Sequence, residues 1–309
     1  MRNDHLLDMS AFYSRLVLHG TLELYTGLRL GVGRDTQVEA TADQVVIKTV
    51  DGRPYIPGSS FKGAWRAATE TLLRGIPDQR AKNLACISVP RDEETVPPPL
   101  CLTTAAVSRL KTTPPDDWPE ILDGRAAQVA GKSLDDALRI LSCRTCRVFG
   151  APWLAGKVLI KDLTVGPAWD GLTRPDVRDG VAIDRDKGSA APKRKYTYEV
   201  VPAGTPFDLQ LVVENASDAE LGLAWLGLLA FQQGQIPLGG ARSRGLGWCK
   251  LRIDWSKSQW LARDTLVEDL FPDDPASRPG SMVEDGTSRA TEWLNAFLCE
   301  AGLKRNSDE

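Results

Sequence analysis

The sequence predicts an α+β protein with the element order βαββαβ, and two observations lead to this fold class. Segments in which apolar and polar residues alternate, as in β-strands, are separated by segments with apolar residues at helical spacing. The chain has 309 residues, of which 42% are apolar and 26% charged, so it has the length and composition to bury a core. This element order is the ferredoxin-like (RRM-like) plan.

Two helices and four strands make up this expected core. The first helix covers Ser60–Arg74, in which Phe61, Trp65 and Leu72 recur at helical spacing. The second helix covers Ala219–Gln233 and follows Ser217 and Asp218, residues that favour a helix start. The four strands are expected at Ser14–Tyr25, Lys157–Val165, Phe207–Glu214 and Leu246–Trp255.

Two insertions interrupt the core, which we expect to span residues 1–255. The first, residues 75–155, is rich in proline and poor in residues that build a core. The second, residues 169–202, is charged and has little apolar content, which is typical of a long hairpin that reaches a partner or ligand. Residues 256–309 form an extension in which we expect helices at Gln259–Leu270 and Ala290–Leu303.

The segment Pro54–Gly63 is typical of an anion site. Pro57 and Gly58 turn the chain, and the hydroxyls of Ser59 and Ser60 can cap the free amides of the helix that follows. Lys62 and Arg66 lie four residues apart and therefore share one helix face. Free amides beside two cations suit a phosphate, while an ordinary capped turn with solvated cations is the alternative.

A second glycine-rich loop, Pro237–Gly247, joins the second helix to the last strand. Its four glycines permit positive φ angles, and Arg242 and Arg244 offer guanidinium groups to phosphate oxygens. It is neither a Walker A loop, because no Gly-Lys-Ser/Thr follows, nor a Rossmann turn, because it precedes a strand. A tight turn with solvated arginines is the alternative to a site for a polyanion.

Six cysteines are present, and two of them form the C-x-x-C motif Cys143–Cys146. The tight turn of such a motif lets two thiolates bind one metal ion, and Cys86 and Cys101 from the same insertion are candidates to complete a tetrahedral zinc site. That site would stabilise an insertion that burial alone does not. A redox motif and scattered buried cysteines are the alternatives; the second suits Cys249 and Cys299.

The net charge is −3, which argues against a protein covered in positive charge but not against a local basic groove. No apolar run reaches the length of a membrane span, and the N-terminus lacks an apolar signal core. We therefore expect a cytoplasmic protein without a membrane partner.

Together these motifs resemble the RAMP superfamily of CRISPR proteins, and within it the repeated backbone subunit that tiles along the guide RNA of type III effector complexes. They occur in the family order and cover most of residues 14–255. The matching segments are Thr26–Gly33, Pro54–Gly63, Cys143–Gly150, Gly180–Arg185, Tyr198–Thr205 and Pro237–Gly247.

The resemblance implies a ferredoxin-like palm, a zinc-bearing finger and a thumb hairpin within Arg178–Tyr198 that kinks the guide–target duplex. It also implies that the palm binds guide-RNA phosphates and that base pairing, not the protein, reads the sequence. The implied partners are guide CRISPR RNA, complementary target RNA and other CRISPR effector subunits. The implied RNA-binding residues are Ser59, Ser60, Lys62, Arg66, Arg185, Arg242 and Arg244.

In target-cleaving members of the family, an aspartate before the Pro-Gly-Ser-Ser turn supports RNA cleavage. Asp43 stands at that place, with Val45 where the family motif has proline; Asp35 is the second candidate and Glu39 the third. Such a carboxylate can hold a divalent cation (Mg²⁺ or Mn²⁺) or orient a 2′-hydroxyl for attack on its own phosphate. A solvated loop aspartate is the alternative.

Four functions are considered from the sequence. The first two are a target-cleaving endoribonuclease subunit and a non-catalytic RNA-binding scaffold of the same complex. A guide-processing endonuclease commonly relies on histidine, and the chain has only His5 and His19. A metabolic zinc enzyme needs an open metal site with a nearby base, and the sequence supplies no histidine-rich set for one.

Overall fold

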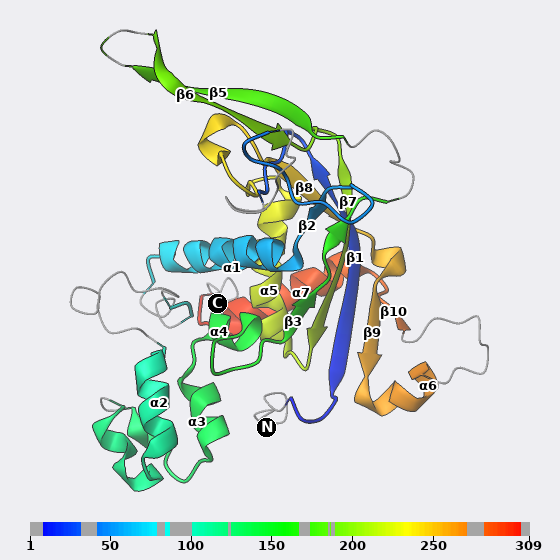
Figure 1. Ribbon diagram of the computed structural model, residues 1–309. Helices are drawn as coiled ribbons and strands as arrows, with labels where there is room; N and C mark the ends of the chain where they lie inside the picture. Colours follow the sequence, from blue (N-terminus) through cyan, green and yellow to red (C-terminus); the bar gives the residue numbers. More distant parts are fainter. Residues whose placement is uncertain are drawn as a thin grey trace.

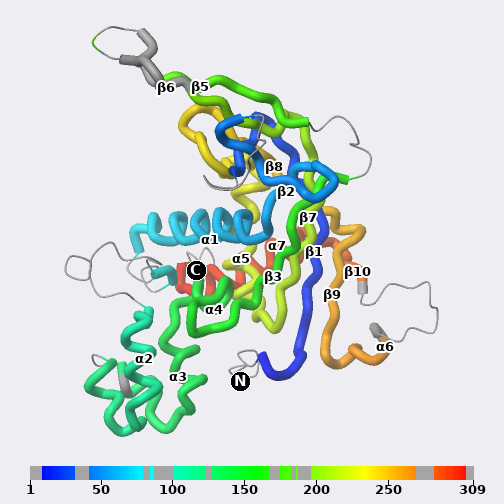
Figure 2. Tube along the Cα trace, viewed as in Figure 1, coloured from blue at the N-terminus to red at the C-terminus, as the bar shows by residue number. Residues whose placement is uncertain are grey.

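The structure is a computed structural model that describes residues 9–31, 42–78, 84–86, 101–122, 125–166, 174–184, 186, 189–270 and 281–303. A central antiparallel sheet has the helices α1, α5 and α7 on one face (Figure 1). The hairpin β5–β6 projects at one end of the molecule, and α2 and α3 lie at the opposite end (Figure 2). The expected α+β class is confirmed, and the sheet is antiparallel.

Four antiparallel strands form the middle of the sheet in the spatial order β8–β1–β7–β3. Side chains on β1 and β7 alternate between buried and more exposed positions, which lets one face of the sheet pack against helices. The strands are β1 (Ser14–Leu24), β3 (Val158–Ile160), β7 (Pro206–Glu214) and β8 (Cys249–Ile253).

Two helices cover this sheet, α1 (Gly58–Gly75) and α5 (Asp218–Gln232). Phe61 of α1 stacks on Phe231 of α5 with ring centroids 4.9 Å apart. The Trp65 indole N–H donates to the Ala224 carbonyl at 2.8 Å, so this large side chain is buried with its polar atom satisfied. The helices therefore bury Phe61 and Trp65 as the spacing predicted, whereas Leu72 is exposed and Leu73 takes the buried position.

The strand expected over Lys157–Val165 is interrupted between β3 and β4 (Leu163–Thr164). Strand β4 pairs with β2 (Tyr55–Ile56), which leads into α1. The interruption places Asp162 where its Oδ1 accepts the Gly58 amide of α1 at 2.8 Å.

The expectation that Ser59 and Ser60 cap the first helix is wrong. The helix begins earlier, at Gly58, with Pro57 before it and no side-chain cap from its N-cap residue. Gly58 allows this because a Cβ there would lie 2.8 Å from the Ile160 carbonyl oxygen of β3. The serines therefore lie inside the first turn, and the Asp162 carboxylate takes the role expected of them.

The extension adds strands as well as a helix. The sequence predicted a helix over Gln259–Leu270, but Gln259–Ala262 forms the strand β9, which pairs with Ser14–Val17 of β1. Strand β8 covers only Gly20–Leu24 of the same edge of β1, so the rest of that edge needs another partner. This tertiary pairing overrides the local pattern.

Around β9 lie short elements and one long helix. Strand β10 pairs with β9, and the helix expected over Ala290–Leu303 is present as α7, which packs against α5. Their bounds are η7 (Trp255–Lys257), η8 (Arg263–Thr265), α6 (Leu266–Leu270), β10 (Ser281–Met282) and α7 (Gly286–Glu300).

The first insertion builds a helical unit with an apolar cluster of its own. The expectation that it is poor in core residues is wrong, because Leu110, Trp118 and Leu138 are buried together in it. Its elements are α2 (Thr104–Thr112), η3 (Pro115–Glu120), η4 (Ala126–Gln128), α3 (Leu134–Leu141) and α4 (Arg144–Phe149).

The second insertion contains an antiparallel hairpin of β5 (Asp176–Asp184) and β6 (Ser189–Val200). At its base, the chain after β6 pairs with the segment that follows β1, through two hydrogen bonds between Leu28 and Val201. The glycine-rich loop beside it contains the short helix η6 (Arg242–Arg244). Among the described helices, none is both long and apolar enough to cross a bilayer.

Candidate metal centre and nucleic-acid interface

The structure brings together the four cysteines of the first insertion. Cys143 precedes α4 and Cys146 lies in its first turn, while Cys86 and Cys101 come from separate segments. Their sulfur atoms all lie within 4.8 Å of one another, and all four residues are buried. The remaining cysteines, Cys249 (buried) and Cys299 (exposed), are not members of this cluster.

The geometry and chemistry of the cluster fit a tetrahedral zinc ion. Zn–S bonds of about 2.3 Å put neighbouring sulfurs about 3.8 Å apart, and the Cys86 and Cys146 sulfurs are 3.5 Å apart. Hydrogen bonding with Cys101 raises the pKa of Cys86 and of Cys146, whereas hydrogen bonds from Cys143 and Cys146 lower that of Cys101. A metal ion would bind these sulfurs as thiolates and displace their protons.

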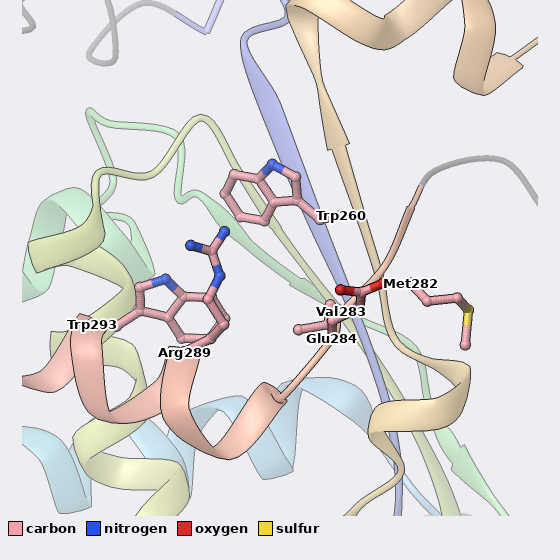
Figure 3. A pocket seen from close by; sticks show the side chains of 6 residues that line it. All are labelled: Trp260, Met282, Val283, Glu284, Arg289 and Trp293. Atoms are coloured by element: carbon pink, nitrogen blue, oxygen red, sulfur yellow. The ribbon is translucent and has the colours of Figure 1, made fainter.

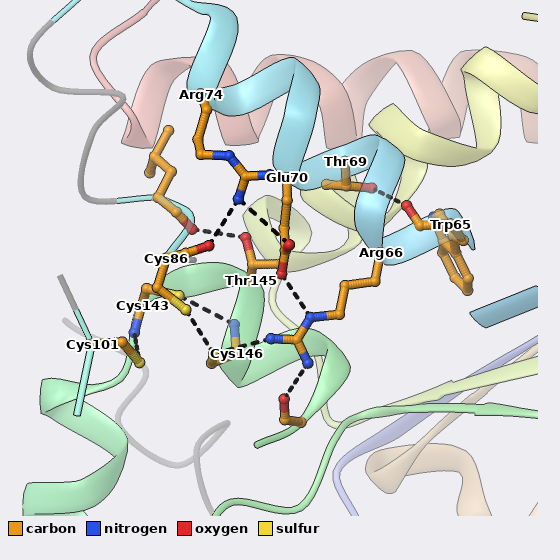
Figure 4. Close-up of polar contacts among 12 residues, drawn as sticks. Trp65, Arg66, Thr69, Glu70, Arg74, Cys86, Cys101, Cys143, Thr145 and Cys146 are labelled. Atoms are coloured by element: carbon orange, nitrogen blue, oxygen red, sulfur yellow. Dashed lines mark hydrogen bonds and ion pairs between the residues drawn. The ribbon is translucent and has the colours of Figure 1, made fainter. Parts of the chain in front are cut away.

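Arg66 turns its guanidinium toward this cluster, as Figure 4 shows. Its Nη2 lies 3.3 Å from the Cys146 sulfur, its Nη1 donates to the Gly150 carbonyl at 2.8 Å, and its Nε donates to Glu70 at 2.7 Å. Burial acts to lower the pKa of Arg66, but the bond to Glu70 and the nearby Cys146 raise it above its usual value. The predicted phosphate ligand thus contacts the cysteine cluster.

The start of α1 combines a cation with an anion that the sequence prediction missed. Lys62 donates one ammonium proton to the Val158 carbonyl at 2.7 Å, and burial, with a smaller effect from Arg66, lowers its pKa. Asp162 occupies the Gly58 amide, so its carboxylate opposes an incoming phosphate at this helix end. Ser59 is exposed and Ser60 half-buried in the same turn.

The glycine-rich loop presents both of its arginines to solvent. Gly239, Gly245 and Gly247 have φ angles of +73°, +83° and +86°, which glycine adopts without strain. Gly239 also lies so close to the Arg29 carbonyl oxygen that a Cβ would be 2.3 Å from it. Arg242 and Arg244 are exposed on the tight turn that results.

The base of the hairpin β5–β6 contacts this loop through an aromatic pair. The Arg244 Nη1 donates to the Tyr196 hydroxyl at 2.7 Å. The rings of Tyr196 and Tyr198 have centroids 5.9 Å apart, and the Arg29 guanidinium lies 5.2 Å from the Tyr198 centroid. Two cations and two aromatic rings from three separate chain segments therefore form one surface.

Asp43 is exposed and contacts the same strand β6 through Thr197. Its Oδ2 accepts the Thr197 amide at 2.6 Å and the Thr197 hydroxyl at 3.2 Å, and the Asp43 amide donates back to that hydroxyl at 3.0 Å. Within the described part of the chain, the other carboxylate oxygen, Oδ1, has no hydrogen-bond partner. The carboxylate is thus held by one oxygen and open at the other.

Two residues after Thr197 in β6, the buried carboxylate of Glu199 also contacts the segment that follows Asp43. Glu199 accepts the Val46 amide at 3.0 Å and pairs with Lys48 at 2.9 Å, and it has only 3% of its surface exposed. The segment after Asp43 is therefore anchored along β6. Asp35, Glu39 and Arg185 lie outside the described residues.

Sequence reasoning missed Asp162, Thr197 and Glu199. The only available signal was the alternation in Tyr196–Glu199, which places the tyrosines on one face of the strand and Thr197 and Glu199 on the other. Which segment each face contacts depends on folding and cannot be read from that alternation.

A hollow of about 510 Å³ lies apart from these groups in the extension. Figure 3 shows Arg289 and Trp293 of α7 facing Trp260 of β9 across it. Of the sequence-predicted site residues that the structure describes, none lines this hollow.

The described fold is an antiparallel α+β sheet protein with a four-cysteine insertion and a hairpin beside a basic glycine loop. A sequence model of the RAMP superfamily matches residues 21–250, well over half of the chain. The chain therefore belongs to the RAMP superfamily of CRISPR proteins, and the resemblance seen in the sequence is confirmed. Membership implies a ferredoxin-like core, in agreement with the order β8–β1–β7–β3.

Two curated relatives match shorter parts of the chain. The CRISPR system Cms endoribonuclease Csm3 of Enterococcus italicus is 35% identical over 72 residues, which are 23% of this chain and 34% of the relative. The protein of the same name from Methanocaldococcus jannaschii is 41% identical over 56 residues, 18% of this chain and 23% of the relative. The matched segments thus span about a third or less of these relatives.

Proposed function

We propose that this chain is the guide-RNA-binding backbone subunit of a type III CRISPR effector complex and that Asp43 supports cleavage of target RNA paired to the guide. The observation that carries this proposal is the position of Asp43 at the hairpin base, held through Oδ2 with Oδ1 open. Superfamily membership and the partial similarity to proteins named as endoribonucleases support it.

The proposed architecture has a palm in residues 1–255, a finger in residues 75–155 and a thumb in residues 169–202, with residues 256–309 as an extension. The partners are guide CRISPR RNA, complementary target RNA and the other CRISPR effector subunits of a filament. A structural zinc ion at the four cysteines stabilises the finger, because the cluster is closed by four protein ligands.

The proposed guide-RNA surface lies along the glycine loop and the start of α1. Arg242 and Arg244 are exposed, and their guanidinium groups suit phosphate oxygens. At the start of α1, Ser59 and Ser60 contribute hydroxyl donors, and Lys62 contributes the ammonium protons that its bond to Val158 leaves free; the Asp162 carboxylate makes this part of the surface the weaker one. Arg185, within the proposed thumb, completes the set. Contacts to the RNA backbone hold any guide sequence equally, so base pairing supplies the specificity.

In the proposed cleavage step, Asp43 acts on the target RNA at its open oxygen. Asp43 Oδ1 accepts the proton of a target 2′-hydroxyl, whose oxygen attacks the adjacent phosphorus while the bond to the 5′-oxygen breaks. That leaving oxygen takes a proton from water, giving a 2′,3′-cyclic phosphate and a 5′-hydroxyl end. A divalent cation (Mg²⁺ or Mn²⁺) held at this carboxylate would stabilise the charge on the phosphate.

The test is Asp43→Ala in the assembled effector complex, with Asp51→Ala as the control. Asp51 is an exposed aspartate of the same segment, bonded to Thr49 and Arg53. We expect Asp43→Ala to slow cleavage by about 100-fold or more, because general-base catalysis contributes 10² to 10⁴, and to leave target binding unchanged. Unchanged cleavage in Asp43→Ala with full guide and target binding would contradict the proposal.

The second candidate is a scaffold that binds RNA without cutting it. The hydrogen bonds between Asp43 and Thr197 favour it, because they also give the carboxylate a purely structural task. Asp43→Asn separates the two, since its amide oxygen still accepts both bonds but is no base. Loss of cleavage in Asp43→Asn supports the nuclease, whereas a wild-type complex that binds but never cuts its target supports the scaffold.

A further inference from the structure

Arg66 has partners that differ from those its sequence position suggests. It stands one helical turn after Lys62, on the face expected to bind phosphate, but its hydrogen bonds to other described residues all lie on the side of the cysteine cluster. Nε, Nη1 and Nη2 donate to Glu70, to the Gly150 carbonyl and to the Cys146 sulfur. Gly150 and Cys146 both belong to the α4 region of the finger.

The contact with Cys146 has an electrostatic reason. Four thiolates around one divalent ion carry a net charge of −2, and a buried charge of this kind needs compensation. Arg66 is half-buried, and its Nη2 lies 3.3 Å from the Cys146 sulfur. A hydrogen bond from a cation to a thiolate is stronger than one between neutral groups, and such outer partners orient metal ligands.

Arg74 provides a comparison on the same helix. It also pairs with Glu70, but it donates to the backbone carbonyl of Cys86 at 2.9 Å rather than to a sulfur. Arg66 and Arg74 therefore share a helix and the partner Glu70, and each bonds to a segment that carries a cluster cysteine, but only Arg66 touches a metal-binding atom (Figure 4).

We propose that Arg66 is a positioning residue of the four-cysteine metal site, donating to the Cys146 thiolate of the loaded cluster and linking metal binding to helix α1. This rests on the proposed structural zinc and not on the cleavage reaction. Arg66 then contributes to RNA binding only through the metal-ordered start of α1 and not as a phosphate ligand.

The first experiment measures zinc affinity of the full-length chain by competition with a chromophoric chelator. We expect Arg66→Gln to weaken zinc binding by about 10-fold to 100-fold, the usual effect of removing an outer partner of a ligand, and Arg74→Gln to change it little. The thiolate-to-metal band of the Co²⁺-loaded protein should shift in Arg66→Gln alone. Equal zinc affinity in Arg66→Gln and wild type would overturn the proposal.

The second experiment measures binding of guide-length RNA at saturating zinc. We expect Arg66→Gln then to match wild type within about twofold and with the same salt dependence, since no phosphate contact is lost. A persistent loss of affinity, with a salt slope reduced by about one, would assign Arg66 to phosphate and overturn the proposal. Wild-type protein that binds zinc but no RNA would contradict the proposed function and leave the zinc result standing.

Arg66→Lys covers the case in which Arg66→Gln does not fold. Lysine keeps the positive charge but loses the planar guanidinium group, so the zinc affinity should lie between those of wild type and Arg66→Gln. If Arg66→Gln does not fold, the affinity of Arg66→Lys should still be below that of wild type. Wild-type zinc affinity in a folded Arg66→Lys with an unshifted Co²⁺ band would count against the sulfur contact.

Discussion

Side chains at the base of the hairpin contact both the loop proposed to bind guide RNA and the aspartate proposed to support target-RNA cleavage. In strand β6, Tyr196 and Tyr198 contact Arg244 and Arg29, whereas Thr197 contacts Asp43. A strand places successive side chains on opposite faces, so one short run of residues contacts both the basic loop and the candidate catalytic carboxylate. The orientation of Asp43 therefore depends on Thr197, a residue that carries no catalytic chemistry itself.

Thr197→Val tests this dependence in the assembled complex. Valine keeps the backbone amide bond but removes the hydroxyl, so Asp43 loses one of its two donors to Oδ2 and the acceptor of its own backbone amide. We expect target cleavage to slow by about 10-fold with target binding unchanged, because misplacing a catalytic group lowers the rate of the reaction but not the affinity for the target.

The matched control is Thr49→Val, which removes the hydroxyl of another threonine–aspartate pair in the same segment, with Asp51. In the background of Asp43→Ala, Thr197→Val should have no further effect on cleavage. A full additional loss in that double variant would mean that Thr197 does not act through Asp43.

At the scale of elements, helix α5 is the centre of the fold. It is apolar on nearly all sides because α1, α4, α7 and the sheet surround it, and its start has a capping box between Ser217 and Glu220. Glu220 also pairs with the buried Lys157 at 2.6 Å, which connects the helix start to the strand side. Close packing against α7 explains why α5 carries glycine at Gly222.

Gly222→Ala should destabilise the protein, against the usual preference of helices for alanine. A Cβ at Gly222 would lie 2.0 Å from the Trp293 carbonyl oxygen of α7, so the helices must separate. We expect the free energy of unfolding to fall by about 1 to 3 kcal/mol, the typical result of overpacking, measured by denaturant titration.

Gly63→Ala in α1 is the matched control. Outside its own helix backbone and chain neighbours, no atom of another described residue lies within 4 Å of a Cβ there, so the substitution should stabilise the protein by up to about 1 kcal/mol through helix propensity. The same sign of change in both variants would refute the packing account of Gly222.

Some elements followed from local pattern and others did not. The apolar spacing of Phe61 and Trp65 and the alternation along β7 predicted helix and strand correctly, because each pattern suits only one packing face. The helix predicted over Gln259–Leu270 was wrong at Gln259–Ala262, because these residues pair with the open edge of β1 as a strand. The prediction that the helix starts at Ser60 was wrong, because Asp162, which accepts the amide of Gly58 at the observed start, lies 104 positions away in the chain.

At the scale of the whole molecule, the cysteine cluster joins the first insertion to helix α1. It gathers Cys86, Cys101, Cys143 and Cys146, and it contacts α1 through Arg66 and Arg74. Among the described residues, the insertion also has an apolar cluster separate from the main core. Metal binding is therefore expected to govern how the insertion docks on α1 more than whether its helices form.

Metal removal should lower the thermal stability of the full-length chain. We expect Cys146→Ser, or a strong chelator, to lower Tm by several degrees and to increase amide hydrogen exchange in α4 and around Cys86, since metal binding free energy is folding free energy. The helices α2 and α3 should keep their protection, because their own core remains.

Cys299→Ser is the control, because Cys299 is exposed and outside the cluster. It should leave Tm and the response to chelator unchanged. If Cys146→Ser behaves like Cys299→Ser, the cluster has no structural metal.

The sequence by itself determined the α+β class, the order of the main elements, the superfamily and which four cysteines are candidate metal ligands. These depend on local periodicity and on short motifs in the chain. Only the tertiary structure decided that Arg66 contacts a cysteine sulfur, that β9 completes the edge of β1, and that Asp43 is held by Thr197. Asp43 and Thr197 are 154 positions apart. A contact over that separation depends on how all the intervening elements pack, which no local pattern encodes.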